Sequence, residues 1–190
     1  MEKGGLVSAL TRVAVRAGQA VGHLDEMRLG RVGATRRRWG IRGVKIVQPL
    51  RRRYEWSYLV LLVDGEQSKP WWTWQPTMRS DDLLVTLADL HVGERVAAVV
   101  WEGAPAHRER RVRALGLPLV ELPPSSPELN PAERIFEEIR RQVEGEVYAP
   151  RADKQAAVEA YLCELAAHPE RVHALAGWAW IHDALAQFAA

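Results

Sequence analysis

Three carboxylates stand at points where predicted secondary-structure elements end or begin. Asp25 follows a short apolar stretch, residues 20–24, that is typical of a strand. Glu102 lies just after a valine-rich apolar run, residues 96–100, that is typical of a buried central strand. Glu133 falls in the first turn of a helix predicted to follow a proline-rich loop. Adjacent strands of a sheet place their ends side by side, and a helix packed across that edge adds a third side chain, so we expect the acids to converge.

Convergent carboxylates favour one kind of chemistry. They repel one another unless a cation neutralises them, and ligation by oxygen alone favours Mg²⁺ or Mn²⁺. Two such ions, roughly 3.5 to 4 Å apart, activate a water or a 3′-hydroxyl and stabilise the leaving oxygen in phosphoryl transfer. Spacing alone leaves the alternative open that these acids are simply solvated at the ends of their strands.

The sequence that leads to Glu133 is the most specific motif in the chain. Residues 122–133 read LPPSSPELNPAE, and this segment resembles the signature of mariner-type DDE transposases, in particular of their bacterial insertion-sequence branch. Three upstream segments resemble further parts of that family in the family's order: LDEMRLG at 24–30, WGIRG at 39–43 and VVWEGAPAH at 99–107. The resemblance covers about residues 20–148.

This resemblance implies an α/β fold, a ribonuclease-H-like mixed β-sheet flanked by helices. It implies a DNA endonuclease and strand transferase that cuts DNA at transposon ends and joins them to a target. Asp25, Glu102 and Glu133 then take the first, second and third catalytic positions and ligate Mg²⁺ or Mn²⁺, as two ions. The implied partners are transposon-end and target DNA, and a homodimer or a partner chain.

The second catalytic position departs from the family pattern. It is normally aspartate, whereas Glu102 is one methylene longer. Glutamate still ligates Mg²⁺, but the added length displaces the carboxylate by about a bond length, and reactive geometry tolerates little error. An alternative is therefore an impaired or domesticated remnant that binds DNA or a partner transposase without turnover. A host nuclease of the same fold is a third hypothesis.

Other residues near the acids carry expectations of their own. By resemblance, His107 faces the active site and contacts the scissile phosphate or the metal shell; the alternative is a surface histidine at a helix start. We expect Asn130 to cap the helix that carries Glu133, with Pro131 in its first turn. Glu26 points to the opposite face from Asp25 if both lie in the strand.

Charge is divided unevenly along the chain. The net charge is +2, yet the segment 28–53 contains ten basic residues and no acidic one. We expect six of its arginines to flank one β-hairpin and to contact DNA phosphates, because neutralised phosphates supply most sequence-independent affinity. The alternative is a hairpin whose charge only aids solubility. These arginines are Arg36, Arg37, Arg38, Arg51, Arg52 and Arg53.

A tryptophan cluster on one predicted strand admits two interpretations. Trp71, Trp72 and Trp74 interleave with Lys69 and are able to stack on unpaired bases at a nicked end. Packing of alternate side chains into a core and onto a surface is the more common role of such a cluster.

The element order predicts a mixed sheet layered by helices in one domain of 190 residues. We expect its core at about 20–148 and C-terminal helices at about 151–188, without an N-terminal helix-turn-helix module, so that another chain would recognise transposon ends. The remaining predicted elements are helices at 6–19, 79–90 and 106–115 and strands at 43–48, 55–63, 66–74 and 117–122.

Cysteine usage and hydropathy bear on location. The single cysteine, Cys163, excludes an internal disulfide and a cysteine-based metal site, which suits a reducing cytosol. No segment approaches the roughly 20 apolar residues of a membrane helix. We expect a cytoplasmic bacterial protein, associated with the nucleoid and not with a membrane.

Overall fold

A five-stranded mixed sheet forms the centre of the computed structural model, which describes residues 19–30, 39–47, 54–92, 95–103, 110–124, 126–180 and 183. The strand order is β3-β2-β1-β4-β5, in which β1 pairs with β2 and β2 with β3 antiparallel, while β1 pairs with β4 and β4 with β5 in parallel. The strands are β1 (Ala20–Gly30), β2 (Trp56–Asp64), β3 (Lys69–Gln75), β4 (Val96–Trp101) and β5 (Leu119–Glu121).

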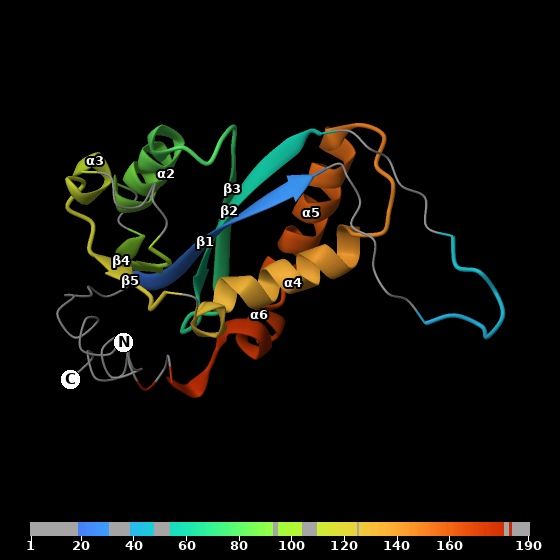
Figure 1. The fold of residues 1–190 in the computed structure, drawn as a ribbon. Helices are drawn as coiled ribbons and strands as arrows, with labels where there is room; N and C mark the ends of the chain where they lie inside the picture. The colour runs from blue at the N-terminus through green and yellow to red at the C-terminus, as the bar shows by residue number, and fades with distance from the viewer. Residues whose placement is uncertain are drawn as a thin grey trace.

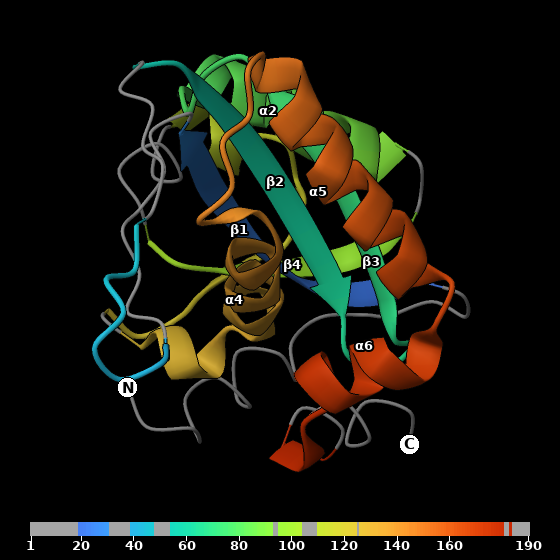
Figure 2. The same cartoon turned by 90° about the vertical axis from the view of Figure 1, so that its right-hand side faces the viewer.

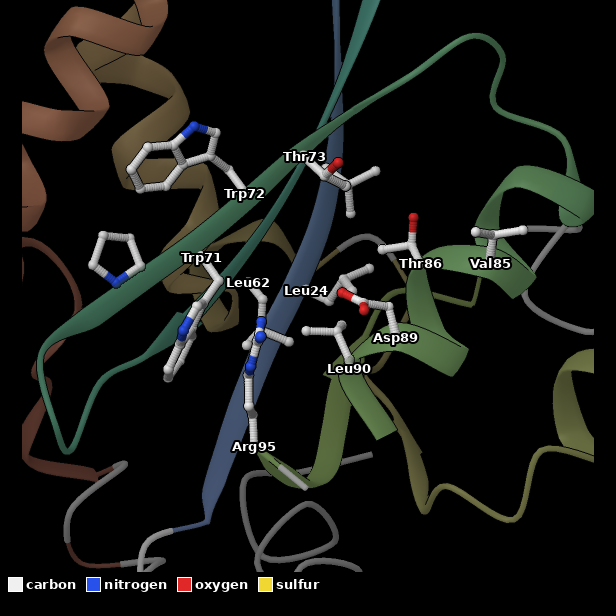
Figure 3. Close-up of a pocket in the computed structure, with 12 residues that line it drawn as sticks. Leu24, Leu62, Trp71, Trp72, Thr73, Val85, Thr86, Asp89, Leu90 and Arg95 are labelled. Atoms are coloured by element: carbon white, nitrogen blue, oxygen red, sulfur yellow. The ribbon is translucent and has the colours of Figure 1, made fainter. Parts of the chain in front are cut away.

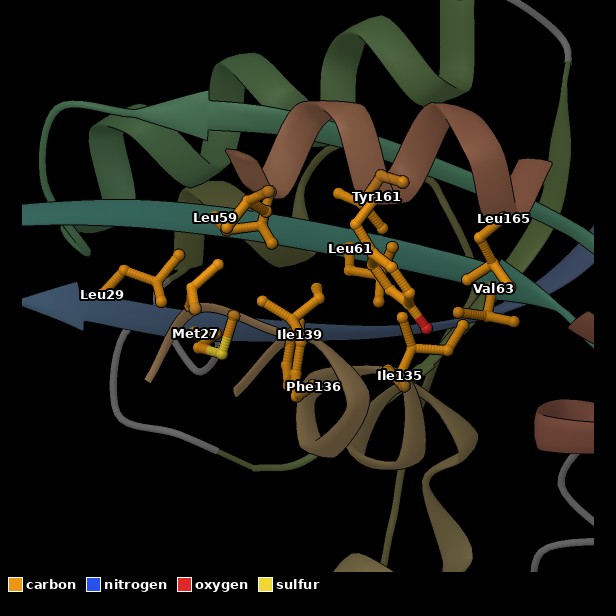
Figure 4. Close-up of a cluster of buried hydrophobic side chains, with 14 of the residues drawn as sticks. Met27, Leu29, Leu59, Leu61, Val63, Ile135, Phe136, Ile139, Tyr161 and Leu165 are labelled. Carbon is orange, nitrogen blue, oxygen red and sulfur yellow. The ribbon is translucent and has the colours of Figure 1, made fainter. Parts of the chain in front are cut away.

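The two faces of the sheet bury separate cores. Alternate residues of a strand point to opposite faces, so Leu59 and Leu61 of β2 pack with Met27 against one group of helices, whereas Val60 and Leu62 pack on the other side. Figure 4 shows the first of these cores, between the sheet and two helices. Figure 2 shows α4 (Pro131–Val143), α5 (Arg151–Ala166) and α6 (Pro169–Ala176) on that face. The opposite face carries α2 (Ser80–Val92) and α3 (Arg110–Arg113).

Strand β1 extends beyond the predicted strand. Asp25 was expected to follow its end, but β1 continues to Gly30, with Asp25 opposite Leu61 and Glu26 opposite Val60 of β2. Pairing with β2 therefore carries the strand through two acids that local preference would leave outside it. The consequence for the site is that pairing with β2 holds Asp25 in place.

The prediction of a strand at 43–48 is wrong for residues 43–47, the part of that range that the structure describes. Residues 39–47, called the arm from here on, contain a turn at Arg42 and Gly43 and no strand. Gly43 has a φ of 87°, a left-handed conformation that glycine adopts without strain. Figure 1 shows the arm projecting from the body of the fold.

The remaining strands and the helices lie within a few residues of their predicted positions, apart from two helices. Of the helix predicted at 106–115, the described part is α3, and the helix predicted at 6–19 lies almost wholly outside the described residues. A short 3₁₀ turn, η2 (Pro127–Leu129), leads directly into α4. Within the described chain, every helix is too short or too polar to cross a membrane.

Candidate active site

The three acids line one small cavity. Asp25 projects from the middle of β1, Glu102 follows the last residue of β4, and Glu133 lies in the first turn of α4. They border a cavity of about 50 Å³ together with residues of the proline-rich loop and η2: Leu122, Pro123, Ser126, Pro127 and Asn130. The backbone N–H of Leu122 donates to the carbonyl of Trp101 at 2.7 Å, so this loop begins beside Glu102.

Asn130 joins the helix that carries Glu133 to the strand that carries Asp25. It is the N-cap of α4, as predicted, and its side-chain oxygen accepts from the backbone N–H of Ala132 at 3.1 Å. Its amide nitrogen donates to the carbonyl oxygen of Leu24 at 3.4 Å. Because Asn130 is only 3% exposed, water competes little for these two hydrogen bonds.

Electrostatics within the cavity disfavour a charged Asp25. The side chain is 6% exposed, and its Oδ1 accepts from the backbone N–H of Glu26 at 2.8 Å. Burial first, then the nearby charge of Glu133, raises the pKa of Asp25 to about 8, and Glu102 adds to the rise. A cation in the cavity would reverse both effects, since it stabilises the ionised carboxylates.

The donor set fits a hard cation by its chemistry. All three side chains offer carboxylate oxygens, the ligands that Mg²⁺ and Mn²⁺ prefer. In their present positions, however, no three histidine, cysteine or acidic residues among those described are arranged to ligate one ion. Glu133 instead lies 3.7 Å from Arg140 in an ion pair, with both side chains about one-third exposed. Metal ligation by Glu133 would therefore compete with Arg140.

Of the other residues predicted near the site, some lie within the described part of the chain and some outside it. Glu26 lies in β1 next to Asp25, so its side chain points to the opposite face, as expected. His107 and the six arginines at 36–38 and 51–53 lie outside the described residues.

The tryptophan cluster serves packing at two of its three positions. The indole N–H groups of Trp72 and Trp74 both donate to the carboxylate of Glu159 on α5. These hydrogen bonds connect the edge strand β3 to α5, which confirms the packing interpretation for both residues. Trp71 faces the other side of the sheet.

Sequence reasoning missed a second, larger cavity on that other side. It has a volume of about 450 Å³ between β3 and α2 and is lined mainly by apolar residues, with Asp89 and Arg95 at its edge. Figure 3 shows Trp71, Leu24 and Leu62 bordering this space. Since Leu24 and Asp25 point to opposite faces of β1, the large cavity does not adjoin the three acids.

His23 is a second feature that the spacing did not reveal. It precedes Asp25 by two residues on the same face of β1 and is 1% exposed. Both ring nitrogens lack a hydrogen-bond partner within the described chain, and its ring meets that of Trp180 edge-on at 6.2 Å. Burial lowers the pKa of His23 to about 4, so the imidazole is neutral at neutral pH.

The mixed sheet, its helices on both faces and the acids at its centre define a ribonuclease-H-like fold. The sequence pattern of the DDE superfamily endonucleases matches residues 21–154, and the chain belongs to this family. A search of curated proteins gave no significant match.

Solved structures of Mos1 transposase share the fold. The Mos1 paired-end complex with left transposon end matches with a TM-score of 0.66 and 17% identity, covering 98% of this chain and 60% of that one. The Mos1 mariner paired-end complex with Mn gives 0.65 and 17%, covering 98% and 58%. The Mos1 catalytic domain alone gives 0.58 and 16%, covering 98% and 86%. The chain thus spans about 60% of the Mos1 chain in the paired-end complexes.

Proposed function

We propose that this chain is the catalytic domain of a mariner-like transposase of the bacterial insertion-sequence branch, which cuts DNA at transposon ends and joins it to a target. The observation that carries the proposal is that Asp25, Glu102 and Glu133 border one cavity, in which burial and the nearby charge of Glu133 raise the pKa of Asp25. Membership of the DDE endonuclease family and the fold shared with Mos1 support it.

In this proposal the three acids, Asn130 and His107 have defined tasks. Asp25, Glu102 and Glu133 hold Mg²⁺ or Mn²⁺, as two ions. When bound, the ions supply the charge that stabilises the attacking and leaving oxygens of phosphoryl transfer. Asn130 keeps the first and third acids in register through its contacts with Leu24 and Ala132. His107 contacts the scissile phosphate or the metal shell.

DNA and a second protein chain complete the proposed assembly. The six arginines that precede and follow the arm bind phosphates of transposon-end and target DNA. The arm itself exposes apolar side chains that a protein partner would cover: Trp39, Ile41, Val44, Ile46 and Val47. The partner is a second copy or a chain that carries end-recognition modules, and the site of action is the nucleoid in a bacterial cytoplasm.

Cleavage of a transposon end tests the catalytic part. Purified protein is given a nicked or pre-cut end, built from the inverted repeats that flank its gene, with Mg²⁺ or Mn²⁺. We expect cleavage or joining that Asp25→Ala and Glu133→Ala abolish. Asp89→Ala is the matched control, since this acid lies at the large cavity on the other face. Equal activity in all three variants contradicts the assignment.

Salt dependence of binding tests the DNA-contacting part. Log K falls as log salt concentration rises, and each lost phosphate contact lowers the magnitude of this negative slope by about 0.9. We expect Arg36→Ala, Arg37→Ala and Arg38→Ala together to lower it by roughly two to three. The matched control replaces the three exposed arginines of α3, Arg110, Arg111 and Arg113, and should leave the slope unchanged.

A DNA-binding remnant without turnover is the second candidate, which we test because residue 102 is glutamate where the family pattern has aspartate. This candidate predicts salt-sensitive DNA binding, no cleavage, and no strong effect of divalent metal on the melting temperature. Metal-dependent cleavage in the first experiment excludes it.

A further inference from the structure

Two side chains from the first turn of α5 hold both strands at the point where they leave the sheet toward the arm. Lys154 donates from Nζ to the carbonyl oxygen of Gly30, the last residue of β1, at 2.7 Å. Arg151 donates to the carbonyl oxygen of Trp56, the first residue of β2, at 3.1 Å. Gly30 and Trp56 are register partners, so both contacts fall on one pair. Figure 1 shows α5 beside this end of the sheet, with the arm beyond it.

Burial of the charged Lys154 side chain costs free energy, which its hydrogen bond to Gly30 helps to offset. The side chain is 6% exposed, and burial lowers the pKa of its ammonium group. A cation in the first turn also opposes the helix macrodipole. Burying an ammonium without a partner costs free energy, whereas burying an apolar side chain is favourable. The Gly30 carbonyl accepts a hydrogen bond from the ammonium, and the nearby charge of Glu144 also favours its charged form, so both offset this burial.

The surroundings of this pair form a tightly packed joint. A Cβ on Gly30 would lie 2.4 Å from the Trp56 ring, so only glycine allows the ring to sit there. On Trp56, the Arg28 guanidinium lies 4.1 Å from the ring centroid. The space beside Lys154 and Arg151 admits no water-sized molecule. The group is therefore a joint and not a ligand site.

We propose that Lys154 and Arg151 are positioning residues that fix the direction in which the chain leaves the sheet toward the arm. Asp25 lies on the same strand as Gly30, about 17 Å away at 3.3 Å per residue. A fixed root therefore sets the direction in which the chain leaves the sheet, and with it the orientation of the arm relative to the acid cavity. The effect on DNA rests on the proposed function; the effect on the arm does not.

A distance measurement across the joint tests the proposal. Cys163, the only cysteine, is exposed on α5, so one added cysteine at Val44→Cys gives a pair of spin labels between arm and helix. Labelled chains are diluted with unlabelled protein to exclude distances between protomers. We expect a narrow distance distribution that Lys154→Met and Arg151→Gln both broaden. Lys69→Met, an exposed lysine at the opposite end of the sheet, is the control.

DNA affinity provides the second readout. Loss of a pre-set arm direction should weaken binding of a nicked end on the order of threefold to tenfold. Unchanged distance distributions in both variants overturn the proposal. If Lys154→Met fails to fold, Arg151→Gln, at an exposed residue, decides alone. A broadened distribution with unchanged DNA affinity supports the positioning role and contradicts the DNA-binding role in the proposed function.

Discussion

Asn130 donates a hydrogen bond from its side-chain amide to the backbone carbonyl of Leu24 at 3.4 Å, across 106 positions of sequence. Its side-chain oxygen accepts from Ala132 at the start of α4. Since Leu24 precedes Asp25 and Ala132 precedes Glu133, one side chain fixes the first and third acids relative to each other.

Replacing Asn130 should disturb both stability and the site. Asn130→Ala removes a helix cap and leaves the buried Leu24 carbonyl without this donor, so we expect the free energy of unfolding to fall by about 1 to 3 kcal/mol. Asn130→Asp keeps the capping oxygen but loses the donor to Leu24 and adds a buried carboxylate to the acid-lined cavity, so it should lose at least as much. Denaturant unfolding measures the difference, and a wild-type midpoint for Asn130→Ala would refute the joining role.

Shortening Glu102 should improve catalysis. Glu102→Asp moves the carboxylate back by about one bond length toward the position that aspartate gives it in the family, and we expect cleavage to rise by roughly tenfold. Glu102→Gln should abolish cleavage, because an amide neutralises no metal charge. A loss of activity in Glu102→Asp would instead indicate a cavity built for the longer side chain.

The buried Asp25 should make the metal-free protein less stable as pH rises. Its folded pKa is raised from 3.8 to about 8, so folding requires uptake of a proton throughout that interval. The stabilising effect of Asp25 is complete below about pH 4 and is lost as pH rises to about 8. Within that interval the folded state binds at most one more proton than the unfolded state, so the free energy of unfolding falls by at most about 1.4 kcal/mol per pH unit.

Asp25→Asn provides the comparison, measured by melting temperature in a chelator. The asparagine variant should gain on the wild type between about pH 4 and 8 and keep a constant lead above that range. Added Mg²⁺ should raise the melting temperature of the wild type above pH 8 and leave that of the variant unchanged. Parallel pH profiles of the two proteins would rule out a raised pKa at Asp25.

Removing Glu159 should cost stability without affecting DNA binding. Glu159→Ala leaves the indole N–H groups of Trp72 and Trp74 without their acceptor, which we expect to cost about 2 kcal/mol. Glu159→Gln retains an acceptor and should cost less. Weaker DNA binding in Glu159→Ala, measured well below its melting temperature, would restore the base-stacking interpretation for these tryptophans.

Local signals in the sequence were sufficient for the helix that carries Glu133. Asn130 and Pro131 lie at the N-cap and in the first turn of α4, as their local preferences predicted. The mixed sheet also followed from the order of its elements. Both predictions rest on signals that lie within short stretches of the sequence.

Interactions between distant segments account for what prediction missed. Strand β1 passes through Asp25 because β2 pairs with it, whereas residues 43–47 form no strand although their β-branched residues favour one locally. The hydrogen bonds from Asn130 to Leu24 and from Lys154 to Gly30 join residues more than one hundred positions apart. The periodicity of apolar residues in the sequence does not predict such contacts.

Anomalous scattering from Mn²⁺ tests the central claim most directly. Crystals of the wild-type protein soaked in Mn²⁺ should give anomalous density in the cavity bordered by Asp25, Glu102 and Glu133, with Glu133 released from Arg140. The density should vanish in Asp25→Ala crystals. A cavity that remains without anomalous density in the wild type, with Glu133 still paired to Arg140, would contradict a metal-dependent catalytic centre.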